Sequence, residues 1–152
     1  MTEQEYQITH SKIIECFQWI EFDLKRIISR LGDESFCDNM EKVDKDCFGK
    51  LVSQIRNIEK RDNIAYLSED DYTSLEEVRL IRNYWCHQNY LDVYFDEEKE
   101  TGKLFVRYSK DSQKLTKDFN LANDLLQHIE NICFKIHPVC DGLSPKNIFN
   151  RT

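Results

Sequence analysis

Three polar side chains stand close together in the string RNYWCH: Arg82, Asn83 and His87. Histidine can take up and release protons near neutral pH. Arginine carries a permanent charge on a planar fork that fits phosphate oxygens, and asparagine can orient a hydroxyl or fix an imidazole tautomer. This trio suits cleavage of an RNA backbone by attack of the neighbouring 2′-hydroxyl, which needs no metal. The alternative is a helix that merely carries polar residues on a solvated face.

The segment that must position these residues is predicted to be one helix, from Leu75 to Phe95. At 100° per residue its apolar side chains gather on one broad side; they are Val78, Leu80, Ile81, Tyr84, Trp85, Leu91 and Phe95. Asn83 and His87 stack one turn apart at the edge of that side. Arg82 and His87 are about 140° apart on an ideal helix. Either Arg82 reaches round, or the helix is locally distorted, or a second copy of the chain completes the site.

The string RNYWCH, late in a helical chain, resembles the Arg-x4-6-His motif of the HEPN superfamily, in which a polar residue such as Asn83 commonly follows the arginine. The resemblance extends over the helix organisation from about Ile8 to Ile136. It implies a bundle of four or five helices that usually dimerises, with two motif helices facing each other across a cleft. Many members of that family are metal-independent endoribonucleases that act as toxins or in phage defence, whereas others lack the motif and serve as dimerisation or nucleotide-binding modules.

On this resemblance we expect an endoribonuclease that works as a homodimer without a cofactor. His87 would be the general acid–base, Arg82 would bind the scissile phosphate, and Asn83 would orient His87 or the 2′-hydroxyl. Arg79 and Tyr90, on the same stripe of the helix, are the candidate substrate-binding residues. Two alternatives remain open: a non-catalytic dimerisation or adaptor module, or a toxin held inactive by a cognate antitoxin or other regulatory protein.

The composition indicates one globular domain with a net charge of −7 over 152 residues. An acidic excess disfavours nonspecific nucleic-acid binding, so an RNA substrate would be short, single-stranded or specifically folded. The N-terminus has no apolar region typical of a signal peptide, and no apolar run reaches the length of a membrane span. We therefore expect a cytoplasmic protein that does not bind membranes.

The first half of the chain predicts two further helices. Thr2 to Glu5 forms a capping-box string, and a stripe at alternating steps of four and three runs to Gly32, a natural helix end; its members are Ile13, Phe17, Ile20, Leu24, Ile27 and Leu31. We interpret this stripe as core rather than subunit interface. Residues 33–46 are predicted to be a loop with at most a turn of helix. Asp46 would cap the next helix, which carries an apolar face and a basic face of Lys50, Arg56, Lys60 and Arg61.

The second half predicts the motif helix, opened by the capping string Ser68 to Asp71, and a last helix from Leu115 to Ile136, ended by Pro138. The apolar stripe of that last helix, at steps of three and four, is Phe119, Ala122, Leu125, Ile129, Ile132 and Ile136. Alternation of β-prone residues in Leu104–Tyr108 suggests a short β-hairpin around residues 92–108. The fold class is thus an all-α, HEPN-like bundle over residues 1–137, with an irregular tail over 138–152.

Other chemistry is weakly indicated. Cys133, His137 and Cys140 have a loose metal-ligand spacing, but a structural zinc site usually needs four ligands. The six cysteines are expected to be reduced. His10 is expected to be an ordinary surface residue and His128 a structural one, and Cys86 is expected to pack or to face a partner rather than act as a nucleophile. Motifs of P-loop nucleotide hydrolases, zinc peptidases and serine hydrolases are absent from the sequence.

Overall fold

The computed structural model describes residues 1–88 and 104–136, and within the latter range it describes the side chains from Asp111 onward. These residues form an all-helical bundle. The α-helices are α1 (Glu3–Leu31), α2 (Phe36–Val43), α3 (Phe48–Asp62), α4 (Glu69–Asn83) and α6 (Leu104–Ile136), and the π-helical segment η1 (Tyr84–Gln88) continues α4. The predicted all-α class is confirmed.

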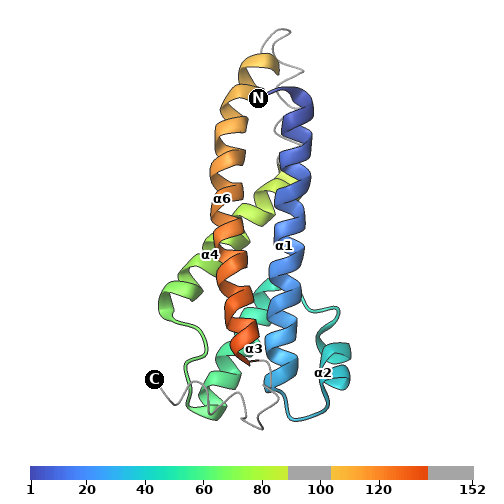
Figure 1. Ribbon diagram of the computed structural model, residues 1–152, viewed down its shortest axis with the longest axis vertical. Coiled ribbons are helices and arrows are strands. Elements are labelled where there is room, and N and C mark those ends of the chain that lie inside the picture. The colour runs from blue at the N-terminus through green and yellow to red at the C-terminus, as the bar shows by residue number, and fades with distance from the viewer. Residues whose placement is uncertain (89–103, 137–152) are drawn as a thin grey trace.

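The two longest helices, α1 and α6, lie side by side and run in the same direction, and α4 runs the opposite way across them (Figure 1). The core lies where these helices meet. All six members of the predicted stripe on α1 are buried, and the predicted positions on α6 are buried except Phe119, which is half-buried. Each such aliphatic or phenyl side chain contributes about 1.5–3 kcal/mol when removed from water. The stripe is therefore core, as predicted.

Both predicted capping boxes are present. The side chain of Thr2 accepts a hydrogen bond from the Glu5 backbone N–H, and the Glu5 carboxylate accepts one from the Thr2 N–H. Ser68 and Asp71 make the same reciprocal pair at the start of α4. These bonds satisfy backbone donors that have no partner inside the helix, which fixes where α1 and α4 begin.

Gly32 ends α1, as predicted, but for a different reason. Its backbone is extended, at φ −70° and ψ 167°, so no left-handed conformation calls for glycine. A Cβ atom there would instead lie 2.5 Å from the side-chain nitrogen of Asn39. Asn39 is buried and donates to the carbonyls of Ser29 and Glu34, at 2.9 Å each. Glycine is needed because the Asn39 carboxamide occupies the adjacent space.

Three local predictions were wrong. Residues 36–43, within the predicted loop, form the two-turn helix α2 with Ser35 as its N-cap. Asp46 does not cap α3: Cys47 holds the N-cap position, and Asp46 accepts hydrogen bonds from Lys50 and Gln54 instead. The segment Leu104–Tyr108 is the first part of α6 and not a strand, so the hairpin around residues 92–108 is not formed there; residues 92–103 lie outside the described residues.

None of the helices in residues 1–88 and 104–136 combines the length and the apolar character needed to cross a lipid bilayer. The predicted tail over residues 138–152 lies outside the described residues.

Candidate functional site

The motif residues lie at the end of α4, whose start is fixed to its neighbours. The Asp71 carboxylate that completes the capping box also accepts a hydrogen bond from His128 Nε2 on α6, at 2.6 Å. Tyr72 donates to Glu59 of α3 at 2.7 Å, and the Arg56 guanidinium lies 3.6 Å from the centre of the Tyr72 ring. Because α4 is tied to α3 and α6 at its first turn, the position of its last turn is constrained. His128 has the structural role predicted for it.

The motif helix departs from α-geometry directly after Asn83. Residues Tyr84–Gln88 form a π-helix, in which hydrogen bonds join residues five apart instead of four. The wider turn reduces the 140° offset that an ideal α-helix would place between Arg82 and His87. Of the three alternatives drawn from the sequence, local distortion is present. Residues 89–95 of the predicted helix, including Tyr90, lie outside the described residues.

Trp85 anchors the π-helical segment to two other helices. Its ring is fully buried, and Nε1 donates to the carboxylate of Asp118 on α6 at 2.8 Å. Its backbone carbonyl lies 3.2 Å from Nε2 of His10 on α1. A carbonyl only accepts, so Nε2 of His10 carries a hydrogen. His10, predicted to be an ordinary surface residue, is therefore a half-buried structural contact of the motif.

Arg82 is held by a carboxylate from α1. Its Nη2 lies 3.1 Å from Oε1 of Glu21, with side chains 28% and 19% exposed. The distance between Nη2 and Oε1 is short enough for an ion pair. No donor is aligned for a hydrogen bond to Oε1, so the contact is mainly electrostatic. Arg82 thus already contacts the Glu21 carboxylate, and any phosphate that binds Arg82 must compete with Glu21.

His87 is exposed to solvent and Asn83 is half-buried. Within the described residues, no hydrogen bond or ion pair holds the imidazole of His87, in contrast to His10 and His128. The imidazole is therefore accessible, which acid–base chemistry on a bound molecule requires.

The other cations near the motif are compensated. Arg79 pairs with Glu76 on its own helix at 2.6 Å, and the Lys114 ammonium contacts the Asp118 carboxylate while lying 4.4 Å from the centre of the Tyr84 ring. Three members of the basic face predicted on α3 also form ion pairs, which join Lys50 to Asp46, Arg56 to Glu69, and Arg61 to Asp62 and Asp33. These cations are therefore already engaged by carboxylates of the chain itself.

Cys86 is half-buried between these groups. Burial raises the pKa of its thiol, while the nearby charge of Arg82 acts in the opposite direction. A thiol with a raised pKa is a poor nucleophile at neutral pH. This agrees with the prediction that Cys86 packs and does not attack a substrate.

Sequence reasoning missed Glu21, Lys114 and Asp118 as neighbours of the motif. Glu21 had a weak signal, because it flanks the apolar stripe between Phe17 and Leu24 and so lies at the edge of the core. Nothing in the sequence pairs it with Arg82, which is on another helix. The two α6 residues carry the i, i+4 spacing of a surface ion pair, and no local pattern indicates that a tryptophan binds one of them.

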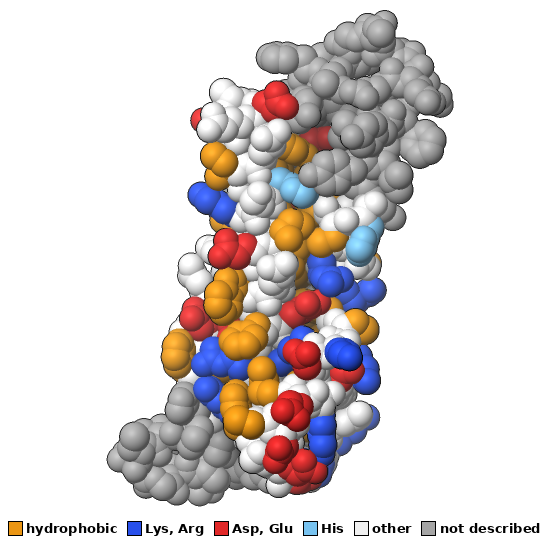
Figure 2. All heavy atoms as spheres, turned by 90° about the vertical axis from the view of Figure 1, so that its right-hand side faces the viewer, with side chains coloured by type: hydrophobic (Ala, Val, Ile, Leu, Met, Phe, Trp, Pro, Cys, Tyr) orange, Lys and Arg blue, Asp and Glu red, His pale blue; other side chains and the backbone are white. Residues whose placement is uncertain are grey.

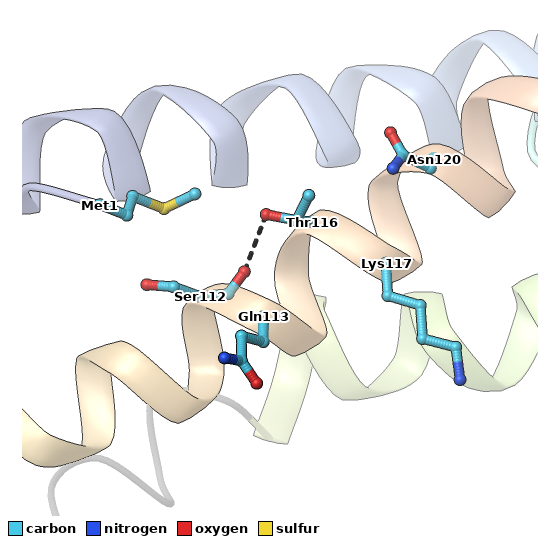
Figure 3. Close-up of a pocket in the computed structure, with 6 residues that line it drawn as sticks. All are labelled: Met1, Ser112, Gln113, Thr116, Lys117 and Asn120. Atoms are coloured by element: carbon cyan, nitrogen blue, oxygen red, sulfur yellow. Dashed lines mark hydrogen bonds between the residues drawn. The ribbon is translucent and has the colours of Figure 1, made fainter.

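A shallow depression of about 690 Å³ lies between the start of α1 and α6 (Figure 3). Met1, Ser112, Gln113, Thr116, Lys117 and Asn120 line it. Of the lining residues, Thr116 points to nearly the opposite side of α6 from Lys114 and Asp118, and its hydroxyl donates to the Ser112 carbonyl at 2.9 Å.

No metal-binding cluster of His, Cys, Asp or Glu side chains occurs among the described residues; His137 and Cys140 lie outside them. Comparisons with protein-family models, with curated proteins and with solved structures each found no match for this chain. Any function must therefore be argued from the site itself.

Proposed function

We propose that this chain is a metal-independent endoribonuclease of HEPN type, which cleaves RNA by attack of the 2′-hydroxyl on the adjacent phosphate. His87 exchanges the proton of the 2′-hydroxyl or of the leaving oxygen, Arg82 binds the scissile phosphate, and Asn83 orients the imidazole or the hydroxyl. The observation that carries the proposal is the exposed imidazole of His87 on a π-turn that begins two residues after Arg82.

A second copy of the chain completes the site in this proposal. Leu80 lies on α4 one turn before the π-helical segment and is 56% exposed. In this proposal the motif helix of the second copy packs against Leu80. Arg82 is two residues from Leu80 and points about 160° away from it around α4, so its long side chain would have to reach round the helix to meet a groove shared by the two copies.

The charge balance supports a weakly held and selective substrate. Arg82 and Lys114 each face a carboxylate, so phosphate binding gains little from nonspecific attraction. In a single-stranded or folded RNA that fits the site, one phosphate would replace Glu21 as the partner of Arg82. RNA that does not fit the site would bind too weakly to stay.

A helical dimerisation or adaptor module is the second candidate, and the Arg82–Glu21 contact favours it. An arginine that joins α4 to α1 across a partly buried contact can be present for stability alone. In this case Arg82→Ala lowers the melting temperature or disrupts the dimer, and the chain cleaves no RNA.

The deciding experiment uses purified protein with a mixed RNA in excess EDTA. Wild type, His87→Ala and Arg82→Ala are compared with His128→Gln, a control that removes another exposed imidazole but keeps an N–H donor for Asp71. Cleavage by wild type and His128→Gln, with loss of about 10²–10⁴ in rate for His87→Ala, supports the proposal. Intact RNA with all four proteins across several substrates contradicts it, and a destabilised Arg82→Ala then favours the adaptor.

A further inference from the structure

The outer face of α1 exposes large apolar side chains that the bundle does not use. Trp19 is 49% exposed and Phe22 is 40% exposed, and their rings meet edge to face with centroids 5.7 Å apart. The Arg26 guanidinium lies 5.7 Å from the centre of the Phe22 ring. Figure 2 views the side formed by α1 and α2 and shows hydrophobic side chains gathered in its lower half with basic side chains between them. Contiguous exposed aromatic residues of this kind usually mark an interaction surface.

The stripe is self-complementary in charge. Glu15, Trp19, Phe22 and Arg26 follow one another at steps of four, three and four, so they form one line along the helix. If a second α1 lies antiparallel with the two-fold axis between Trp19 and Phe22, Trp19 of each copy faces Phe22 of the other. Glu15 then faces Arg26 of the other copy, and this contact occurs twice.

The charges along α1 favour this antiparallel register over a neighbouring one. Placing the two-fold axis at Trp19 instead would set Lys12 against Arg26 of the other copy, a like-charge contact that disfavours it. In the chosen register Lys12 falls opposite position 29, where Ser29 is buried in its own chain, and no like charges meet along the line. We infer that this face of α1 binds a second copy of this chain through an antiparallel, two-fold α1–α1 contact.

This contact is independent of the ribonuclease proposal and leaves the motif accessible. Trp19 and Glu21 are two residues apart, so they point about 160° away from each other around α1. The α1–α1 contact therefore lies on the side of the helix away from Arg82. It does not block the face where Leu80 is exposed.

The first test measures self-association of the full chain by sedimentation over a wide range of concentration. Trp19→Asp and Glu15→Arg are expected to weaken association by roughly tenfold or more, since a central aromatic residue dominates such contacts. Leu80→Asp is the matched control on the motif face. A monomeric wild type, or association that Leu80→Asp weakens and Trp19→Asp does not, overturns the inference. A monomeric wild type would also contradict the motif-face pairing of the ribonuclease proposal, whereas weakening by Leu80→Asp alone would support that pairing; RNA cleavage is measured separately.

The second test exploits the symmetry. Glu15→Arg alone places two arginines opposite each other, and Arg26→Glu alone places two glutamates opposite each other, so each variant resists pairing with itself. Mixing the two variants restores both ion pairs and is expected to give a heterodimer. Arg26 also pairs with the buried Asp23 at 3.0 Å, so circular dichroism checks its fold, and if that variant does not fold the first test decides. Folded variants that fail to form a heterodimer contradict the proposed register.

Discussion

Replacing Trp85 with phenylalanine tests whether the anchored indole holds the π-helical segment. The indole N–H donates at 2.8 Å to the carboxylate of Asp118, and both residues are buried. A hydrogen bond to a charged group contributes about 1.5–3 kcal/mol to stability. The smaller phenyl ring leaves space that costs roughly a further 1 kcal/mol. We therefore expect Trp85→Phe to lower the free energy of unfolding by about 3 kcal/mol.

For a domain of this size, a loss of that magnitude corresponds to a fall in melting temperature of roughly 6–12 °C. Thermal unfolding followed by circular dichroism measures it. Trp19→Phe is the matched control, because Trp19 is half exposed on α1 and its indole N–H makes only a 3.4 Å contact with Glu15; a change within about 0.5 kcal/mol is expected there.

A double-mutant cycle of Trp85→Phe with Asp118→Asn then isolates the bond. If the two changes prove additive, or if both tryptophan variants melt at the wild-type temperature, the indole–carboxylate bond does not hold the segment and the reasoning is refuted. If the ribonuclease proposal is right, Trp85→Phe should also slow RNA cleavage at temperatures where it is folded, since His87 lies two residues further along the same turn.

Three other changes have defined outcomes. Glu21→Gln frees Arg82 for phosphate, so affinity for single-stranded RNA should rise and the slope of log K against log salt should steepen by about 0.7; filter binding that gives an unchanged slope contradicts this. Gly32→Ala should lose about 1–3 kcal/mol because it displaces the bonded carboxamide of Asn39, whereas Gly49→Ala, with its nearest neighbour at 3.9 Å, should be neutral or stabilising in chemical denaturation. Burial raises the pKa of Asp23 against the effect of Arg26, so the folded state binds the proton more tightly than the unfolded state and stability falls as pH rises above the unfolded value of about 3.9. Asp23→Asn should remove that fall, and melting curves across acidic pH that match wild type would disprove it.

Helices whose burial repeats every three to four residues could be predicted from the sequence. The stripe from Ile13 to Leu31 and the stripe on α6 each extend over several turns, so the period is unambiguous. The capping boxes at Thr2 and Ser68 were equally readable, because their bonds are local. The same local signal exists at Ser35, whose side chain accepts from the Asp38 N–H, and it was overlooked in a polar segment that lacks an apolar stripe.

The predicted strand at Leu104–Tyr108 was wrong because five residues cannot distinguish alternation from helical spacing. The segment continues without a break into the long helix α6, and the context overrides the β-propensity of Val106 and Tyr108. Short β-prone runs beside a strongly periodic helix are therefore weak indicators of a strand.

The candidate site was only partly predictable. The types and order of Arg82, Asn83 and His87 were visible in the chain, but the contact of Arg82 with Glu21 joins helices far apart in sequence. The hydrogen bond from His10 to the Trp85 carbonyl likewise joins helices far apart in sequence. Such contacts follow from how the helices pack, and a single sequence contains no direct signal for them.

The π-helical segment makes the geometry of the motif depend on the number of residues in the turn. A π-turn contains one more residue than an α-turn, and within it Trp85 is buried while His87 is exposed. Deleting one residue between Arg82 and His87 would let the turn revert to α-geometry, which would shorten the spacing of the two residues to four and change the angle between their side chains. If the ribonuclease proposal is right, the spacing of Arg82 and His87 is itself part of the site, and substitutions one position at a time would not reveal it.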